Sequence, residues 1–209
     1  MDTSKKFVIT INRELGSGGR TVGRKLAERL GVKYYDKALI EELTKKFNLT
    51  LEKLEQVKGT KPSWWKQLMD SSVKRYDLEE LYNIESNIVT SESIFRVEEE
   101  FLKDLAAEES CVIAGRSGFY IFRNEPNALK IMIQSSMEKR VERVMNKQNV
   151  SEKEARRIIS EVDKQREHYT KLFSGASRYD TRNYDLVINV AGLSEEDAVD
   201  IIMEYMEKA

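Results

Sequence analysis

The chain has 209 residues, of which 40% are hydrophobic, and this length suits one α/β domain with a buried core. Its 35 Lys and Arg nearly balance 36 Asp and Glu, so we expect neither nucleic acid nor an anionic membrane as a partner. A single cysteine, Cys111, excludes an internal disulfide framework, and no apolar run approaches the ~20 residues that cross a bilayer. Because the N-terminus lacks an apolar signal region, we expect a cytoplasmic protein.

The first predicted elements are a strand, a glycine-rich loop and a helix, in that order. Residues 7–21 read FVITINRELGSGGRT, and the apolar residues that follow recur at helical spacing up to Gly31, a helix stop. Small residues let backbone N–H groups approach an oxyanion, and the start of the helix adds attraction for negative charge. This pattern predicts a phosphate-binding loop and hence a phosphotransferase; the loop residues are Gly16, Ser17, Gly18, Gly19, Arg20 and Thr21.

The loop departs from the usual phosphate-loop pattern, which is Gly, four residues, then Gly-Lys-Ser/Thr. The last three positions fall on Gly19, Arg20 and Thr21, whereas the first glycine is replaced by Glu14. Arg20 keeps the charge of the lysine that reaches the β and γ phosphates, but its planar fork is bulkier than an ammonium group. Thr21 keeps the hydroxyl expected on Mg²⁺.

Two other interpretations of the loop stay open. Gly16, Gly18 and Gly23 form part of a dinucleotide fingerprint, with Asp36 at the end of the next strand as its ribose ligand. The distance from the second to the third glycine is longer than this fingerprint requires, and the pair Arg20-Thr21 has no role in it. The second alternative is a glycine-rich turn that binds no ligand.

Further along the chain, four apolar runs predict strands, most of them separated by helical stretches: residues 32–35, 111–114, 129–133 and 186–190. This alternation predicts a parallel sheet with helices on both faces and ligands at the carboxyl ends of the strands. The connection between the second and third strands is too long for an ordinary crossover and predicts a helical insert. Its Trp64 and Trp65 fit the core of the insert, a homodimer surface or a wall of the substrate site.

Three serines predict helix starts through capping boxes: Ser135 with Glu138, Ser151 with Glu154, and Ser194 with Asp197. The helix after Ser135 has a predicted buried stripe of Met137, Val141, Val144 and Met145. In the next helix Arg166 falls among the apolar positions. A guanidinium there needs a partner, which is either an anionic ligand or a carboxylate of the same helix, Asp163 or Glu161, unless its stem carries the charge out to water.

Phosphoryl transfer requires that the charge of two phosphate-bearing reactants be neutralised, so arginines should converge on the site. Arg116 is the strongest candidate beyond the loop, because CVIAGRSG places it directly after a strand and Gly115. Arg140 flanks the stripe of its helix. Arg143, Arg156 and Arg157 are expected to be ordinary surface residues.

Taken together, several segments resemble the cytidylate kinase-like family of P-loop proteins, relatives of the nucleoside monophosphate kinases. They cover nearly the whole chain: ITINRELGSGGRTVGRKLAERLGVKYYDKALI, CVIAGRSGFYIF, LKIMIQSSMEKRVERV, DKQREHYTKLFSG and NYDLVIN. The resemblance implies a three-layer P-loop α/β fold with a five-stranded parallel sheet, a helical acceptor-binding insert and a helical lid. Residues 1–46 and 102–209 would form the core, 47–101 the insert and 150–182 the lid region.

The resemblance also implies ATP and Mg²⁺ as cofactors, with Thr21 as the metal ligand and a mobile lid that closes with arginines. The catalytic residues would be Arg20, Arg116 and Arg166. The substrate-binding residues would be Asp36, Arg116, Ser117, Arg140 and Asp163. Two acceptor motifs are altered: Asp-Gly-Arg-Asp reads Ala114-Gly115-Arg116-Ser117, and Asp-Ser-Gly reads Asp36-Lys37-Ala38.

We therefore expect an ATP-dependent phosphotransferase acting on a nucleoside monophosphate, with CMP or dCMP as the leading acceptor. Two alternatives remain. Glu14 and Arg20 are also compatible with a nucleotide-binding regulatory module that has lost turnover. The altered acceptor motifs are also compatible with a kinase for a small metabolite other than a nucleotide.

Overall fold

The computed structural model describes residues 1–37, 40 and 92–209. The chain divides into two compact units, one formed by Met1–Tyr35 with Ala106–Ala209 and the other by Asp36–Leu105. Of the predicted insert, residues 47–91 lie outside the described residues, and these include Trp64 and Trp65. Most of the fold and the site described below belongs to the first unit, whereas Asp36 and most of the helix Glu92–Glu108 belong to the second.

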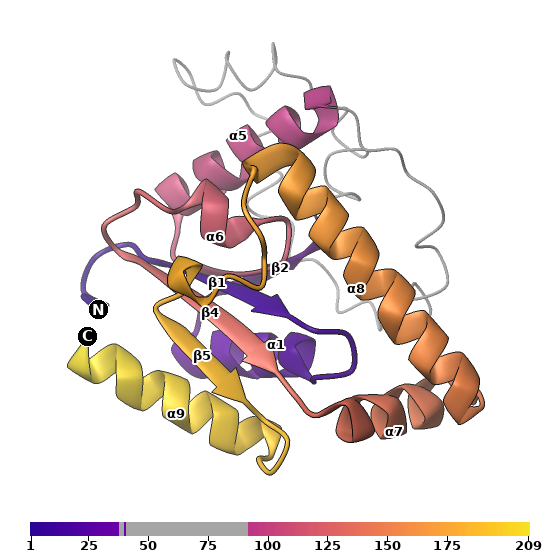
Figure 1. Ribbon diagram of the computed structural model, residues 1–209. Coiled ribbons are helices and arrows are strands. Elements are labelled where there is room, and N and C mark those ends of the chain that lie inside the picture. Colours follow the sequence, from indigo (N-terminus) through magenta and orange to yellow (C-terminus); the bar gives the residue numbers. More distant parts are fainter. Residues whose placement is uncertain (38–39, 41–91) are drawn as a thin grey trace. The chain divides into compact units, whose positions relative to one another are not determined.

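Five strands form a parallel sheet in the order β2-β3-β1-β4-β5 (Figure 1). They are β1 Val8–Arg13, β2 Lys33–Asp36, β3 Cys111–Ala114, β4 Ala128–Gln134 and β5 Leu186–Asn189. Val8 of β1 lies opposite Cys111 of β3 and Ala128 of β4, so β1 is the central strand. All five predicted strands are confirmed, and so is the α/β class with a parallel sheet.

The helices alternate with the strands as expected for right-handed crossovers. They are α1 Gly19–Leu30, α5 Glu92–Glu108, α6 Gly118–Ile121, α7 Met137–Gln148, α8 Glu152–Ser174 and α9 Glu195–Lys208, with a 3₁₀ turn at Thr181–Asn183. Gly31, which has φ +67°, ends α1 as predicted, because a left-handed residue closes the last turn and glycine adopts that conformation without strain.

Alternating residues of β1 point to opposite faces of the sheet. Ile9 and Ile11 are buried with the apolar sides of α1 and α9, which pack against each other. Thr10 points the other way, where its side chain contacts the Gly118 position of α6. The sheet is therefore covered on both faces, and the apolar core of the unit includes the side chains between the sheet and the helices α1 and α9.

The start of α7 differs from the prediction by one residue. Ser136, and not Ser135, is the N-cap: its hydroxyl accepts a hydrogen bond from the Lys139 N–H at 3.3 Å. Ser135 is engaged elsewhere, because its N–H donates to the Glu14 carboxylate. The other two predicted starts are confirmed, since Ser151 caps α8 and Ser194 forms a full capping box at α9 with Asp197.

The buried stripe of α7 also differs from the prediction. Val141 and Val144 are buried as expected, but Met137 is 40% exposed and Arg140 is buried in its place. In α8 the buried positions include Asp163 and Thr170. The two helices thus bury charged or polar side chains that the apolar spacing did not mark as core positions, and a charge is buried only when it is paired.

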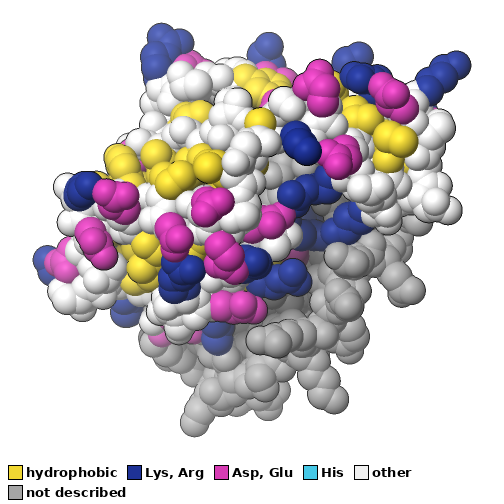
Figure 2. Space-filling model, turned by 90° about the horizontal axis from the view of Figure 1, so that it is seen from below, with side chains coloured by type: hydrophobic (Ala, Val, Ile, Leu, Met, Phe, Trp, Pro, Cys, Tyr) yellow, Lys and Arg dark blue, Asp and Glu magenta, His cyan; other side chains and the backbone are white. Residues whose placement is uncertain are grey.

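Acidic and basic side chains lie side by side over much of the face shown in Figure 2. This arrangement agrees with the nearly balanced composition. Across the part of the chain that the structure describes, no helix has the length and apolar character needed to span a membrane.

The revised cap of α7 gives a first testable prediction. Replacing Ser136 by Ala should lower the free energy of unfolding by about 1 kcal/mol, since the helix loses the acceptor for one of its first N–H groups. The matched change Ser135→Ala keeps the backbone N–H that bonds to Glu14 and should cost much less. Urea unfolding followed by circular dichroism measures both, and a larger loss for Ser135→Ala would contradict the assignment.

Candidate active site

The loops that follow the central strands gather at one edge of the sheet. The segment after β1 carries the glycine loop, the segment after β3 carries Arg116 and Ser117, and the segments after β4 and β5 lie alongside. In open parallel sheets ligands bind at this carboxyl edge, next to the strand where the direction of the crossovers changes. Here that strand is β1, because β3 and β4 flank it.

The glycines of the loop are required by its shape. Gly16 and Gly18 both have φ +82°, a conformation that L side chains rarely adopt. A Cβ on Gly16 would stand 2.7 Å from the Arg140 carbonyl oxygen, and one on Gly19 would stand 2.6 Å from the Arg13 Cβ. Side chains at these positions would therefore displace the atoms around the loop and the first turn of α1.

Ser17 braces the loop from inside. Its hydroxyl donates to the Glu14 carbonyl at 2.9 Å and accepts from the Gly19 N–H at 3.4 Å, and the residue is only 2% exposed. The Ser17 side chain thus links the backbone at the two ends of the segment 14–19, a local arrangement typical of serine in turns.

Glu14, which replaces the usual first glycine, is accommodated by two partners. Its Oε2 accepts from the Ser135 N–H at 3.2 Å, and its Oε1 lies 3.3 Å from Nη1 of Arg140. The carboxylate therefore ties the loop to the start of the segment that leads into α7, and Arg140 balances its charge.

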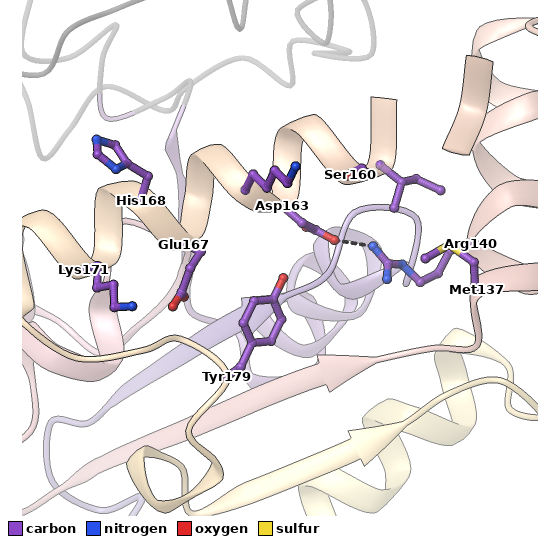
Figure 3. Close-up of a pocket in the computed structure, with 10 residues that line it drawn as sticks. Met137, Arg140, Ser160, Asp163, Glu167, His168, Lys171 and Tyr179 are labelled. Carbon is purple, nitrogen blue, oxygen red and sulfur yellow. Dashed lines mark hydrogen bonds and ion pairs between the residues drawn. The ribbon is translucent and has the colours of Figure 1, made fainter. Parts of the chain in front are cut away.

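Arg140 and Asp163 form a buried ion pair, with side chains 6% and 10% exposed (Figure 3). The same two side chains also bind the backbone of Leu15. Arg140 Nε donates to the Leu15 carbonyl at 2.8 Å, and the Leu15 N–H donates to Asp163 Oδ1 at 3.0 Å. Both residues were predicted to bind substrate. In the structure their charges face each other and the backbone of the glycine loop, and substrate binding by either residue stays a prediction.

Two arginines near the glycine loop, Arg143 and Arg178, were not among the site residues predicted from the sequence. Arg143 is 42% exposed, as expected of a surface residue, and reaches toward the loop: its Nη1 is 2.5 Å from the place that a Cβ on Gly18 would take, and 2.6 Å from Glu195 Oε1. Arg178 is buried with 1% exposure and contacts Asp163. The sequence signal that could have identified Arg143 is its spacing of three residues from Arg140, which places the two on neighbouring turns of one helix. No periodic pattern in the sequence marks Arg178.

The segment after β3 is strained in a way typical of functional sites. Gly115, Arg116 and Ser117 have φ values of +89°, +54° and +52° in succession. For residues other than glycine this conformation costs about 1–3 kcal/mol and persists only where the surroundings enforce it. Both side chains are held down: the Arg116 guanidinium lies 5.1 Å from the Tyr169 ring centroid, and the Ser117 hydroxyl donates to Thr170 Oγ1 at 3.4 Å.

The remaining predicted site residues take the following positions. Arg20 and Thr21 are partly buried in the first turn of α1, and Asp36, at the end of β2, is 4% exposed. Arg166 has its Nη1 3.7 Å from Asp163 Oδ1, the same-helix carboxylate that was one of its two predicted partners. The structure brings the glycine loop, Arg140 and Asp163 into one network, which Arg166 joins through Asp163.

Two clefts flank this network. The first, of about 740 Å³, is lined by Gly16 and Ser17 of the loop, by Arg143 and Asn146 of α7, and by residues 190–193 after β5. The second, of about 530 Å³, has the Arg140–Asp163 pair at its base and α8 as a wall, with Tyr179 extending toward the pair (Figure 3). Both volumes fall in the range of small-molecule sites.

Comparison with known proteins agrees with this geometry. The model of the cytidylate kinase-like family matches residues 8–191. Among curated relatives, a cytidylate kinase of Methanopyrus kandleri is 29% identical over 95% of this chain and 92% of its own length. A cytidylate kinase of Sulfolobus acidocaldarius is 25% identical over 96% of this chain and 94% of its own.

Solved structures share the fold. An uncharacterised protein of Eubacterium ventriosum superposes with a TM-score of 0.72 at 25% identity, covering 97% of this chain and 99% of that one. A shikimate kinase of Bacteroides thetaiotaomicron gives a TM-score of 0.52 at 15% identity, covering 96% of this chain and 98% of its own. With the glycine loop placed at the carboxyl edge of the sheet, the chain belongs to the cytidylate kinase-like family and is a nucleotide kinase-like phosphotransferase.

Proposed function

We propose that the protein transfers a phosphoryl group from ATP to a nucleoside monophosphate, with CMP or dCMP as the preferred acceptor. The observation that carries the proposal is the glycine loop, which leads directly into α1: Gly16 and Gly18 have positive φ, and a Cβ on Gly16 or Gly19 would collide with the atoms around it. Such a loop is suited to polyphosphate, because backbone N–H groups and the helix start attract the same charge.

The cleft beside the loop fits the rest of the donor nucleotide. It continues from Gly16 and Ser17 to the segment 190–193, and its other wall is α7. Arg143 lies where the loop meets this cleft, with its guanidinium against Gly18. We assign Arg143 to the phosphates of the donor, together with Arg20, because arginine pairs with phosphate oxygens through two parallel hydrogen bonds.

Thr21 fits a Mg²⁺ site, since its hydroxyl follows Arg20 in the first turn of the helix that the loop leads into. The metal, when bound, would neutralise charge on the β and γ phosphates. The protein's own contribution is to fix the loop, so that its donors meet the transferring group without further rearrangement.

On the acceptor side we assign Arg116 to the phosphate of the monophosphate. It sits at the carboxyl end of β3 in a strained backbone, stacked on Tyr169 of α8, and is 9% exposed. Asp36 and Ser117 remain proposed acceptor ligands, and Arg166 is proposed to balance the transferring charge. Arg140 and Asp163 we assign to the support of the loop.

The altered acceptor motif favours one alternative. Ala114 and Ser117 replace the two aspartates of Asp-Gly-Arg-Asp, and Ala114 is fully buried with 0% exposure. A kinase of this family that acts on another small hydroxyl-bearing acceptor would show the same donor loop with this altered end of β3.

The acceptor assignment is tested by release of ADP from ATP in a coupled assay. We expect CMP and dCMP to give the highest kcat/KM in a panel that also contains UMP, AMP, GMP and small hydroxy acids. Turnover with a hydroxy acid but with no nucleotide would replace CMP by the alternative. If none of the acceptors in the panel supports release of ADP, the proposal is contradicted.

Gly16→Ala tests the loop. The new methyl group would meet the Arg140 carbonyl, so we expect ATP affinity to fall at least tenfold in calorimetry. Gly31→Ala is the matched control, because Gly31 also has positive φ but its Cβ would meet nothing within 4 Å. This control should lose stability and keep ATP affinity, and equal loss of affinity in both variants would contradict the role of the loop.

Two methionine substitutions separate donor from acceptor. Arg20→Met should raise KM for ATP, and Arg116→Met should raise KM for the acceptor and leave KM for ATP unchanged. Each loses a hydrogen bond to a charged group, worth about 1.5–3 kcal/mol, or about 10- to 150-fold. Two-substrate steady-state kinetics measure both constants, and an Arg116→Met variant that changes KM for ATP alone would refute the assignment.

A further inference from the structure

The largest fully buried side chain of the described residues is a cation, Arg178, which is 1% exposed. It lies outside helices and strands, in the segment that leads from α8 back to β5. Burying a guanidinium is strongly unfavourable unless its donors are satisfied by charged and polar partners. The position of these partners therefore shows what this arginine is for.

The guanidinium of Arg178 contacts the chain just before the glycine loop. Its Nη2 donates to Asn12 Oδ1 at 3.0 Å and to the carbonyl of Arg13. Its Nη1 donates to Asp163 Oδ1 at 3.4 Å, the same oxygen that accepts from the Leu15 N–H. One planar group thus reaches the end of β1 directly and the loop through Asp163.

The backbone of Arg178 is fixed as firmly as its side chain. Its N–H donates to Glu167 Oε2 at 3.0 Å, and its carbonyl accepts from the Tyr184 hydroxyl at 2.7 Å. Burial raises the pKa of Tyr184 to about 12, so this hydroxyl stays protonated at neutral pH and remains a donor. The guanidinium also lies 5.2 Å from the Tyr179 ring centroid, which covers it.

We propose that Arg178 is a positioning residue for phosphoryl transfer, which holds the Arg13 carbonyl and, through Asp163, the Leu15 N–H, and so sets the direction in which the glycine loop leaves β1. The residue does not touch phosphate. It acts through the backbone of residues 13–15, from which Gly16 and Gly18 follow. This inference rests on the proposed binding of a polyphosphate donor by that loop.

The contacts require arginine. Its fork presents five N–H donors in one plane, whereas lysine presents a single compact ammonium that cannot reach Asp163, Asn12 and the Arg13 carbonyl together. An error of about 1 Å in the position of a reacting group can cost on the order of 100-fold in rate. A small rotation of the Arg13 or Leu15 peptide would be passed on to the loop.

The test compares Arg178→Lys and Arg178→Gly with Arg182→Gly, a control on the same segment whose side chain is 87% exposed and paired with Asp180. We expect the Arg178 variants to lower kcat/KM for ATP by about 10- to 100-fold and to leave KM for the acceptor unchanged. Added guanidinium ion, at a concentration that does not denature the protein, should restore much of the activity of Arg178→Gly. The control should match the wild type.

Binding of inorganic tripolyphosphate, measured by calorimetry, gives a second readout that needs no turnover. We expect the wild type and Arg182→Gly to bind tripolyphosphate equally. Both Arg178 variants should bind it at least tenfold more weakly, with the same number of sites per folded molecule. If the Arg178 variants lose only thermal stability, or do not fold at all, the residue is merely structural and the inference is overturned. A wild type that binds neither tripolyphosphate nor ATP would instead overturn the proposed function.

Discussion

The ion pair between Arg140 and Asp163 is the interaction on which the rest of the site depends. It joins α7 to α8, and its two groups also bind the carbonyl and the N–H of Leu15. Removing one partner of an isolated buried pair costs about 3–5 kcal/mol. Here the pair is part of a larger network, because Asp163 also contacts Arg178 and Arg140 also contacts Glu14. The shape of the glycine loop is therefore set by side chains that lie far from it in the sequence.

This pair also bears on how a lid could work in this protein. Asp163 lies in the middle of α8, so the helix predicted to form the mobile lid is attached to the glycine loop at that point. A rigid swing of the whole helix would expose two buried charges. Closure of the site is easier to reconcile with movement at the ends of the helix, where side chains such as those of Arg156 and Arg157 form exposed ion pairs.

The sequence was sufficient to predict the five strands, the glycine loop between β1 and α1, and two of the three helix caps, because these depend on local patterns. The strand Cys111–Ala114 and the stop at Gly31 are examples. The cap of α7 was assigned to the wrong serine, since the choice between Ser135 and Ser136 depends on the distant carboxylate of Glu14. Arg140 took the buried position expected for Met137 for a similar reason: hydropathy does not show that a charge has a partner. Arg178 could not be found in this way, because it belongs to no periodic element.

Glu14 illustrates how such a site constrains change in the sequence. Its carboxylate and the guanidinium of Arg140 compensate each other beside the loop, with side chains 16% and 6% exposed. Glycine at position 14 would leave Arg140 with one anionic partner fewer, and loss of Arg140 alone would remove this cation from beside the Glu14 carboxylate. Across homologues we therefore expect these two positions to co-vary, with replacements fixed as pairs and single exchanges rare.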